Sequence, residues 1–338
     1  MARPLEAKQT QPPFCRARSV HERYNGSWSR SWLNAQSAQL NDMSDPKIVN
    51  PHMGSPVTCN FAHELIKWAS ELPALPSEKT TGYFSGLWFR GHSNSSYGLV
   101  PRVYRDAFTK KASDLWIDRE HFKKLHDEIK GKPDAESQRK RLNLERLVVR
   151  DFLQAGGHLL QPQTTADAYF LAQHFGAPTR LLDWSTNPLV ALYMAVANDE
   201  GKTDKGPDGA VFAMDPTAHL PPDAQPFRAI MAPDHPYAKD AIEVVMNWAN
   251  PNPKYRSHIL PIRPNTQAGR IERQASCFTL HSYGSEETPN STLRHCLIPW
   301  KRKAEIRTAL RSLSINQFTV YNTLDRLSSE LRSTWGIR

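Results

Sequence analysis

The 338-residue chain carries a formal net charge of +9, a pI near 9.4 and 39% hydrophobic residues, enough for a globular core in one large domain or two smaller ones. No apolar run approaches the roughly 20 residues of a membrane-spanning helix, and the N-terminus lacks the apolar stretch of a signal peptide, so we expect a cytoplasmic protein with no membrane partner. The positive charge favours phosphate-rich partners, an acidic antitoxin-like protein, or simply a basic surface without such a partner.

The four cysteines are scattered along the chain without a C-x-x-C pair. This spacing argues against a zinc site and against the disulfide framework of a secreted protein. No metal-ligand motif is evident, and His63-Glu64 lacks the second histidine of a zinc-protease helix. The cysteines are Cys15, Cys59, Cys277 and Cys296.

Residues 1–57 are rich in Pro, Ser, Gln, Asn and Arg and show no sustained period, which predicts a basic N-terminal arm before a domain of residues 58–338. Cations and aromatic residues alternate in the arm, an arrangement that suits stacking along a nucleic-acid strand. The same tryptophans would equally pack on the chain's own domain or on a second subunit. The alternating residues are Arg16, Arg18, Arg23, Trp28, Arg30 and Trp32.

The first half of the domain is predicted to be mainly helical. Apolar spacing indicates a helix over residues 61–72, followed by a short buried strand over residues 87–92 and another extended segment over residues 99–104. Arg90 ends an otherwise apolar strand, where burial is costly unless the guanidinium meets an anion or a carboxylate. Arg90 is thus the first candidate site residue, with a structural ion pair to Asp183 or Glu145 as the alternative.

Helices are next expected over residues 115–129 and 144–153, and from Thr164 to His174. Gly176 suits the left-handed end of that last helix, and Pro178 prevents the helix from continuing.

The stretch from residue 179 to residue 196 combines polar and apolar side chains more densely than any other. A strand is expected over residues 179–184, then a helix that is capped by Ser185, Thr186 or Asn187 and has Pro188 in its first turn. One buried stripe is expected on this helix. The turn before it should present Asp183, Ser185, Thr186 and free backbone N–H groups, an arrangement that can hold an anion.

After residue 200 the pattern changes to strands. Strands are expected at residues 209–214, 257–262 and 296–299, and within residues 270–280, where a polar helix turn or loop leads into a strand. A short helix is expected between residues 237 and 250, and C-terminal helices at about residues 303–313 and 323–334. The sequence therefore predicts an α+β fold: a single mixed domain in which helices frame a small, mainly antiparallel sheet.

Two separated motifs resemble the FRG domain family, which takes its name from a Phe-Arg-Gly motif. The first is Phe89-Arg90-Gly91, and the second is the long run from Gln173 to Tyr193, Q-H-F-G-x-P-T-R-L-L-D-W-S-x-x-P-x-x-A-L-Y. Arg270-Ile271-x-x-Gln274 with Phe278 and the stretch over residues 315–327 are also similar to the family's C-terminal half. The family occurs widely in bacteria and phages and is associated with defence or toxin-like contexts.

The order of these parts also resembles the arginine, serine-threonine, glutamate layout of ADP-ribosyltransferases. The resemblance implies an ADP-ribosyltransferase-like fold and NAD as substrate, with a carboxylate that stabilises positive charge on the ribose. It implies that Arg90 holds a phosphate or the ribose, that Ser185 and Thr186 hold the ribose, and that Tyr193 or Trp184 stacks on nicotinamide. The implied catalytic residues are Arg90, His174, Glu272 and Gln274; the implied cofactor-binding residues are Arg90, Arg180, Asp183, Trp184, Ser185, Thr186 and Tyr193.

The chain departs from this layout at the late polar position. Gln274 matches the FRG pattern but is not a carboxylate, and Glu272 would share a face with it only on an extended segment. His174 either contacts the substrate or caps the C-terminal end of its helix. Arg180 and Asp183 could instead pair with each other or with Arg90 in a structural network. The sequence thus predicts a defence or toxin-type, antiphage effector that uses NAD to modify a nucleic acid or a host protein. The alternative is a non-catalytic nucleotide-sensing or nucleic-acid-binding module. A third possibility is a nuclease-like effector, but the sequence offers no acidic metal cluster to support it.

Overall fold

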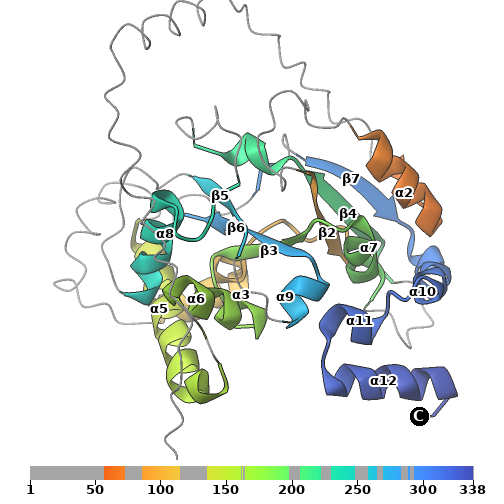
Figure 1. The fold of residues 1–338 in the computed structure, drawn as a ribbon. Helices are drawn as coiled ribbons and strands as arrows, with labels where there is room; N and C mark the ends of the chain where they lie inside the picture. Colours follow the sequence, from red (N-terminus) through yellow and green to blue (C-terminus); the bar gives the residue numbers. More distant parts are fainter. Residues whose placement is uncertain are drawn as a thin grey trace, which may run out of the picture. The chain divides into compact units, whose positions relative to one another are not determined.

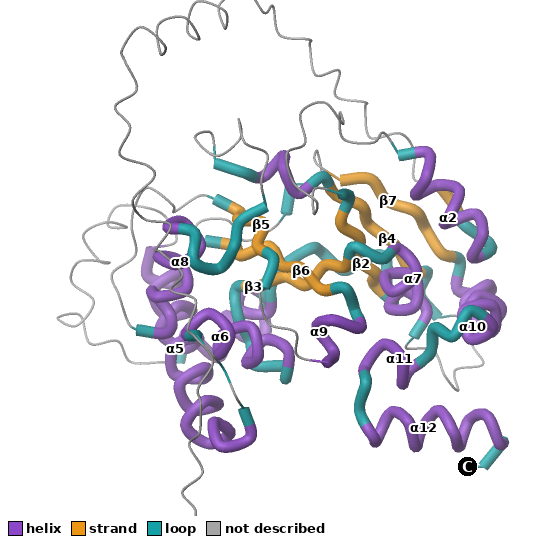
Figure 2. The backbone as a smooth tube through the Cα atoms, viewed as in Figure 1, coloured by secondary structure: helices purple, strands orange, loops and turns teal. Residues whose placement is uncertain are grey.

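A mixed sheet with helices packed against it organises the chain as an α+β fold, as predicted (Figures 1 and 2). The predicted N-terminal arm and the predicted helix over residues 115–129 lie outside the residues that the structure describes. The computed structural model describes residues 57–72, 86–114, 135–160, 162, 164–197, 206–221, 230–247, 258–264, 269–282, 288–289 and 293–337.

The elements alternate along the chain as follows. The helices are α2 (Ala62–Glu71), α3 (Asp106–Ser113), α5 (Ala135–Gly156), α6 (Thr165–His174), α7 (Pro188–Val196), α8 (Pro236–Met246), α9 (Gly269–Arg273), α10 (Lys303–Ser312), α11 (Gln317–Tyr321) and α12 (Leu324–Trp335). The strands are β1 (Val57–Thr58), β2 (Trp88–His92), β3 (Leu181–Ser185), β4 (Gly209–Met214), β5 (Ile259–Ile262), β6 (Ser276–His281) and β7 (Leu293–Ile298).

The described strands form one sheet in the order β1-β7-β4-β2-β3-β6-β5, and it is mainly antiparallel because β1 and β7 alone among them pair in parallel. Most neighbouring strands pair along their length: β2 with β4 from Trp88 to His92, and β3 with β6 from Leu181 to Ser185. In contrast, β2 and β3 pair only at Phe89 and Ser185. The sheet is therefore two halves that diverge where β2 meets β3.

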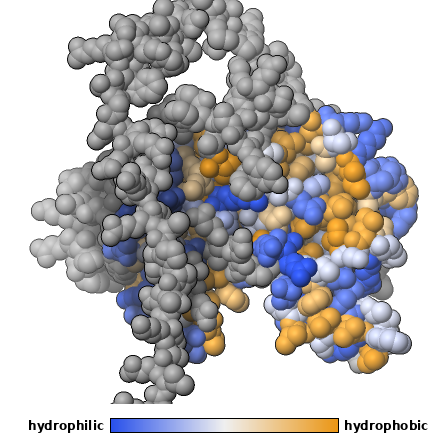
Figure 3. Space-filling view, viewed as in Figure 1, coloured by the Kyte–Doolittle hydropathy of each residue, from blue (hydrophilic) through white to orange (hydrophobic). Residues whose placement is uncertain are grey.

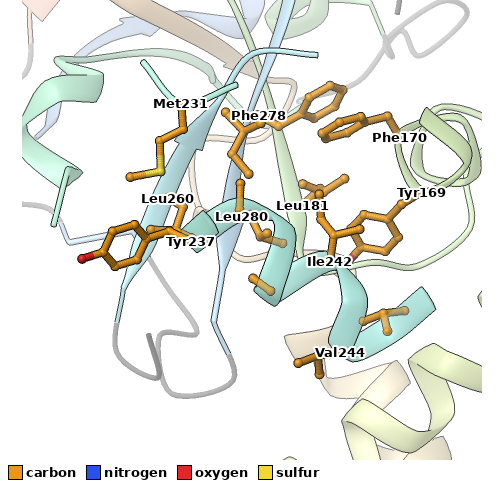
Figure 4. Packing of buried hydrophobic residues seen from close by; sticks show 14 of the residues in the cluster. Tyr169, Phe170, Leu181, Met231, Tyr237, Ile242, Val244, Leu260, Phe278 and Leu280 are labelled. Carbon is orange, nitrogen blue, oxygen red and sulfur yellow. The ribbon is translucent and has the colours of Figure 1, made fainter. Parts of the chain in front are cut away.

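Two groups of helices cover the two halves. Helices α5, α6 and α8 pack on β3, β5 and β6, where Phe170 stacks on Phe278 with ring centroids 5.2 Å apart (Figure 4). Helices α2, α7 and α10 pack on the half formed by β2, β4 and β7. Figure 1 shows the two groups at opposite ends of the sheet. A third cluster, formed by Trp88, Leu99, Leu182, Trp184, Met214, Cys277 and Leu293, includes residues of both halves. Each fully buried large apolar side chain contributes roughly 1.5–3 kcal/mol, so this cluster joins the two halves of the sheet.

Local signals in the central stretch produced the expected helix ends. Thr164 caps α6 together with Asp167, and Gly176 takes the left-handed conformation with a φ of +96°. Asn187 is the residue that caps α7, and Pro188 occupies its first turn.

Helix α7 differs from the prediction of one buried stripe, because it is buried on nearly every side. It lies between the sheet and helices α2 and α10. A Cβ atom at Gly91 of β2 would lie 1.8 Å from the carbonyl oxygen of Ala191, and one at Gly209 of β4 would lie 2.6 Å from that of Ala195. The backbones of strand and helix thus touch, which only glycine permits.

A buried ion pair joins α5 to the start of β3. Glu145 is fully buried, and its carboxylate accepts hydrogen bonds from Arg180 Nε (3.0 Å), Arg180 N (2.9 Å) and the Tyr169 hydroxyl (2.6 Å). Burial is the largest single influence and lowers the pKa of Arg180, but the attraction and hydrogen bond of Glu145, together with Tyr169 and Tyr104, outweigh it and raise that pKa. Arg180 Nη2 also donates to Ala241 O of α8 (2.8 Å), so one guanidinium connects three elements.

The extended segment expected over residues 99–104 is wrong in its second half. Residues Arg102–Tyr104 form a 3₁₀ turn, closed by a hydrogen bond from Tyr104 N to Pro101 O (3.0 Å). Pro101 stands directly before the turn, with φ −54° and ψ 155°, and lacks the N–H group that a strand would use for pairing, which disfavours a continuous strand here.

The scattered cysteines also form a bond that their spacing did not predict. Cys59 and Cys296 are joined by a disulfide although they are 237 residues apart. The parallel pairing of β1 with β7 brings them together, with Cys59 N donating to Leu297 O (2.8 Å). Cys277 is a buried free thiol.

The C-terminal helices are confirmed, and α11 adds a short turn before the last one. Helix α12 keeps apolar side chains exposed, including Leu324 and Trp335, and Figure 3 shows apolar surface over the end of the molecule that Figure 1 labels α12. Across the described part of the chain, every helix is too short or too polar to cross a membrane.

We expect Gly91→Ala to lower the free energy of unfolding by roughly 3 kcal/mol or more, because the new methyl group overlaps the backbone of α7. Gly86→Ala is the matched control, since a Cβ there meets nothing within 4 Å. Urea denaturation of both variants measures the difference. Equal stabilities would show that strand and helix do not touch as described.

We expect Glu145→Gln to lower the free energy of unfolding by about 3–5 kcal/mol, because it leaves the Arg180 guanidinium buried without its countercharge. Asp151→Asn removes the partner of Arg150 in an exposed pair on the same helix and should cost about 0–1 kcal/mol. Denaturation curves for the two variants provide the test, and a loss of less than about 1 kcal/mol in Glu145→Gln would contradict the role of the buried pair.

Candidate functional site

A cleft of about 890 Å³ opens where β2 and β3 diverge. Its walls come from β2, from the segment over residues 93–106, from the end of α6, from β3, from the turn before β6, and from α7 and α11. Segments that are far apart in the sequence thus meet at one place. The volume lies in the range of sites for small molecules and cofactors.

Arg90 extends from β2 across the divergence toward β3. Its Nη1 donates to the main-chain oxygen of Asp183 (2.5 Å) and lies 3.8 Å from the Asp183 carboxylate. Burial lowers the pKa of Arg90 to about 10; Asp183 opposes the shift, and Arg105 and Arg102 add to it. The structural pairing of Arg90 with Asp183 that the sequence left open is therefore present, within the cleft itself.

His92, two residues further along β2, orients Arg90. Arg90 Nε donates to His92 Nε2 (2.9 Å), so that nitrogen is an acceptor, and His92 Nδ1 donates to Tyr97 O (3.1 Å). Burial lowers the pKa of His92 to about 3, with a further contribution from the charge of Arg90. The imidazole is neutral at physiological pH and serves as a fixed hydrogen-bond acceptor.

A chain of polar side chains positions the Asp183 carboxylate. Gln173 Nε2 donates to Asp183 Oδ2 (2.9 Å), and Thr179 donates through its hydroxyl to Gln173 Oε1 (2.6 Å). Gln173 and Thr179 are buried, whereas the Asp183 side chain is 50% exposed. The carboxylate is thus held by the protein on one oxygen and faces the cleft.

The turn between β3 and α7 does not offer the free N–H groups that were predicted. Thr186 N donates to Ala275 O (3.1 Å), Asn187 N to Ser185 Oγ (2.9 Å) and Leu189 N to the Asn187 side chain (2.9 Å). The carbonyl oxygen of Ala275 satisfies one of these donors, and the side chains of Ser185 and Asn187 satisfy the other two at the start of the helix. This helix start is not an anion site.

Ser185 connects β3 to the residue before β6. Its hydroxyl donates to Gln274 O (2.6 Å), which leaves the Gln274 side chain at the cleft. Gln274 Nε2 is buried and has no hydrogen-bond partner among the described residues. Glu272 does not share an extended segment with Gln274, since it belongs to α9, and Ala275 then turns the chain with a φ of +46°.

The structure brings some predicted site residues to the cleft and leaves others elsewhere. Arg180 forms the buried pair with Glu145, Glu272 is exposed on α9, and Tyr193 packs beside Tyr321 in the core around α7. Trp184 borders the cleft, but its Nε1 donates to Thr279 (3.0 Å). Neither Arg180, Thr186, Tyr193 nor Glu272 lines the cleft; Arg90, His174, Asp183, Trp184, Ser185 and Gln274 do.

Several polar residues of the cleft were not predicted from the sequence, among them His92, Gln173, Arg102 and Arg105. Two-residue alternation on β2 would have placed His92 with Arg90, and the motif around Gln173 already contained that side chain. Arg102 and Arg105 had no such signal, because the 3₁₀ turn that presents them was expected to be extended.

We expect the His92 imidazole to remain neutral down to about pH 4, because its pKa is lowered from 6.5 to about 3. Below pH 6.5 the unfolded chain binds a proton at His92 that the folded chain does not, so stability should fall as the pH decreases toward 3. Between pH 6.5 and 5, the free energy of unfolding of His92→Gln should depend on pH less steeply than that of the wild type, by the equivalent of about one proton. NMR titration of the His92 ring supplies the direct measurement, and a midpoint near 6.5 would contradict the burial and bonding described.

Comparison with known proteins gives one match. No curated protein and no solved structure matches the chain. Residues 85–204 match the FRG domain family, and this span contains β2 with its Phe-Arg-Gly motif, the end of α6, β3 and α7. These are the elements that form most of the cleft. The chain therefore contains an FRG domain, and Arg90 of its signature motif lies at the centre of the candidate site.

Proposed function

We propose that the protein is an NAD-using ADP-ribosyltransferase, or an NAD-cleaving transferase, that acts in the cleft between β2 and β3. The observation that carries this proposal is that Arg90, Ser185 and Gln274 come from three neighbouring strands or strand starts and meet at one site. In the layout of ADP-ribosyltransferases that the sequence resembles, the arginine, the serine-threonine pair and the later polar residue must lie at one site. The volume of the cleft also suits a dinucleotide.

NAD supplies the chemistry, since its bond between nicotinamide and ribose breaks and positive charge develops on the sugar. The chain's contribution is electrostatic. Asp183 places a carboxylate in the cleft, held on one oxygen by Gln173, where it would stabilise that charge. Arg90 presents its remaining Nη2 group to a phosphate. We therefore assign the carboxylate role to Asp183 instead of Glu272.

Ser185 acts as a positioning residue in this proposal. Its hydroxyl is engaged with Gln274 O and Asn187 N, so it holds the late polar residue against β3. The unpaired Gln274 amide nitrogen is the donor that a ligand oxygen would satisfy. His174 lies at the mouth of the cleft beside the exposed ring of Phe175, where an acceptor molecule would approach.

The acceptor and the biological setting belong to the same proposal. The net charge of +9 favours a nucleic acid as acceptor, with a host protein as the alternative, and the FRG domain connects the activity with antiphage or toxin-type effectors and their antitoxin or defence partners.

One observation favours a second candidate function, a nucleotide-sensing module without turnover. The late polar residue is an amide, and Glu272 does not line the cleft. In a sensor, the same arginine and amide groups would recognise a nucleotide, and Asp183 would serve only to balance the charge of Arg90.

The test is release of nicotinamide from NAD by purified full-length protein, with and without an acceptor mixture. We expect Arg90→Ala and Asp183→Asn each to lower the rate by about 100-fold or more, because each removes a charge aimed at the reacting group. Arg294→Ala is the matched control, since Arg294 is a half-buried arginine on β7 that does not line the cleft. Folding of each variant is checked by circular dichroism.

Two outcomes would overturn the transferase proposal. The first is saturable NAD binding without turnover by the wild type, which supports the sensor. The second is turnover that survives in a folded Asp183→Asn variant, which removes the proposed carboxylate.

A further inference from the structure

Two arginines at the rim of the cleft are held in place by neutral groups. Arg102 Nη1 donates to Gly176 O at the end of α6 (2.6 Å), and Arg105 Nε donates to Val100 O (3.1 Å). Both side chains line the cleft and are solvent-accessible. The carbonyl oxygens orient the guanidiniums without neutralising them, so the remaining N–H groups are available to an anion.

These two charges act on each other and on Arg90. Burial lowers the pKa of Arg105, and Arg102 lowers it further. Both rim arginines also lower the pKa of Arg90, against the opposing effect of Asp183. Three guanidiniums and two carboxylates, those of Asp106 and Asp183, thus line one cleft, so the charge of its lining is net positive and favours a ligand that carries negative charge.

Arg90 cannot form a two-pronged contact with such a ligand, because two of its three nitrogens already donate to the protein. Its Nε is bonded to His92 and its Nη1 to Asp183 O, which leaves Nη2 for a ligand. Within the described residues, the hydrogen bond of Arg102 uses Nη1 and leaves Nε and Nη2 for a ligand, and that of Arg105 uses Nε and leaves both terminal nitrogens. Each rim guanidinium can therefore engage a phosphate through two parallel hydrogen bonds, the geometry in which arginine binds phosphate best.

We propose that Arg102 and Arg105 form a diphosphate-binding subsite at the rim of the cleft, one guanidinium for each phosphate of a nucleoside diphosphate group. The inference rests on the proposed function for the identity of the ligand, the diphosphate of NAD. It assigns the recognition of this group to the 3₁₀ turn and the start of α3, and leaves Arg90 to the inner end of the ligand.

The test uses ADP, AMP and adenosine as probes and calorimetry on the full chain at one fixed ionic strength. We expect the wild type to bind ADP at least about tenfold more tightly than AMP, and the Arg102→Gln/Arg105→Gln variant to lose this preference. Lys110→Gln/Lys111→Gln is the matched control, because it removes the same two charges from α3, outside the cleft, and should keep the preference. Arg102→Lys/Arg105→Lys keeps the charge, lacks the two-pronged geometry, and should bind ADP more weakly than the wild type.

Three results would overturn the inference: no ADP binding by the wild type, an unchanged preference for ADP in the glutamine double variant, or equal losses in the Lys110/Lys111 control. If Arg102→Gln/Arg105→Gln does not fold, Arg102→Lys/Arg105→Lys provides the test. An affinity of this lysine variant for ADP equal to that of the wild type would then overturn the inference. The measurement does not require NAD cleavage. ADP binding that depends on Arg102 and Arg105, without nicotinamide release, would reject the transferase reaction and retain the subsite. Nicotinamide release with an unchanged KM for NAD in the glutamine double variant would retain the reaction and reject the subsite.

Discussion

The hydrogen bond from Arg90 to the main-chain oxygen of Asp183 spans the place where the sheet divides, and much of the site depends on it. Where β2 and β3 diverge, strand carbonyls lose the N–H partners that continuous pairing would provide. The guanidinium supplies one such donor, and neutral His92 holds it at the correct angle. The same side chain therefore joins the two strands by a hydrogen bond and places a positive charge in the cleft.

The two helix groups maintain this divergence from either side. The Glu145–Arg180 pair ties α5 and α8 to the start of β3, while contact of α7 with Gly91 ties the other group to β2. Each group has its own apolar cluster, and a third cluster that includes Trp88 of β2 and Trp184 of β3 joins the two halves, so the strands on both sides of the cleft are packed in place. A cleft built between rigid elements holds charged groups in fixed positions, which is the condition for electrostatic recognition or catalysis.

Sequence signals that act within one or two turns predicted their structures well. Thr164 with Asp167, Gly176 and Pro188 each determine a helix end through bonds to nearby backbone, and the structure confirms all three. One error has a long-range cause and the other a mainly local one. The single stripe expected on α7 was wrong because the helix is enclosed by the sheet and by helices α2 and α10. The free N–H groups expected before it were wrong because the side chains of Ser185 and Asn187 and the carbonyl oxygen of Ala275 accept from them.

The sequence by itself determined the α+β class and the order of the main elements, since periodicity and capping residues are local properties. It also singled out Arg90, Asp183 and Gln274, which the structure places at one cleft. Only the tertiary structure decided which polar residues share the cleft. Arg180 lies in a buried pair with Glu145, and Glu272 lies outside the cleft. Arg102 and Arg105 line the cleft because the segment that was predicted to be extended forms a 3₁₀ turn. The reason is physical: a charge is placed by the partner it meets across the fold, and that partner lies 35 residues away for Arg180 and 74 for Arg102.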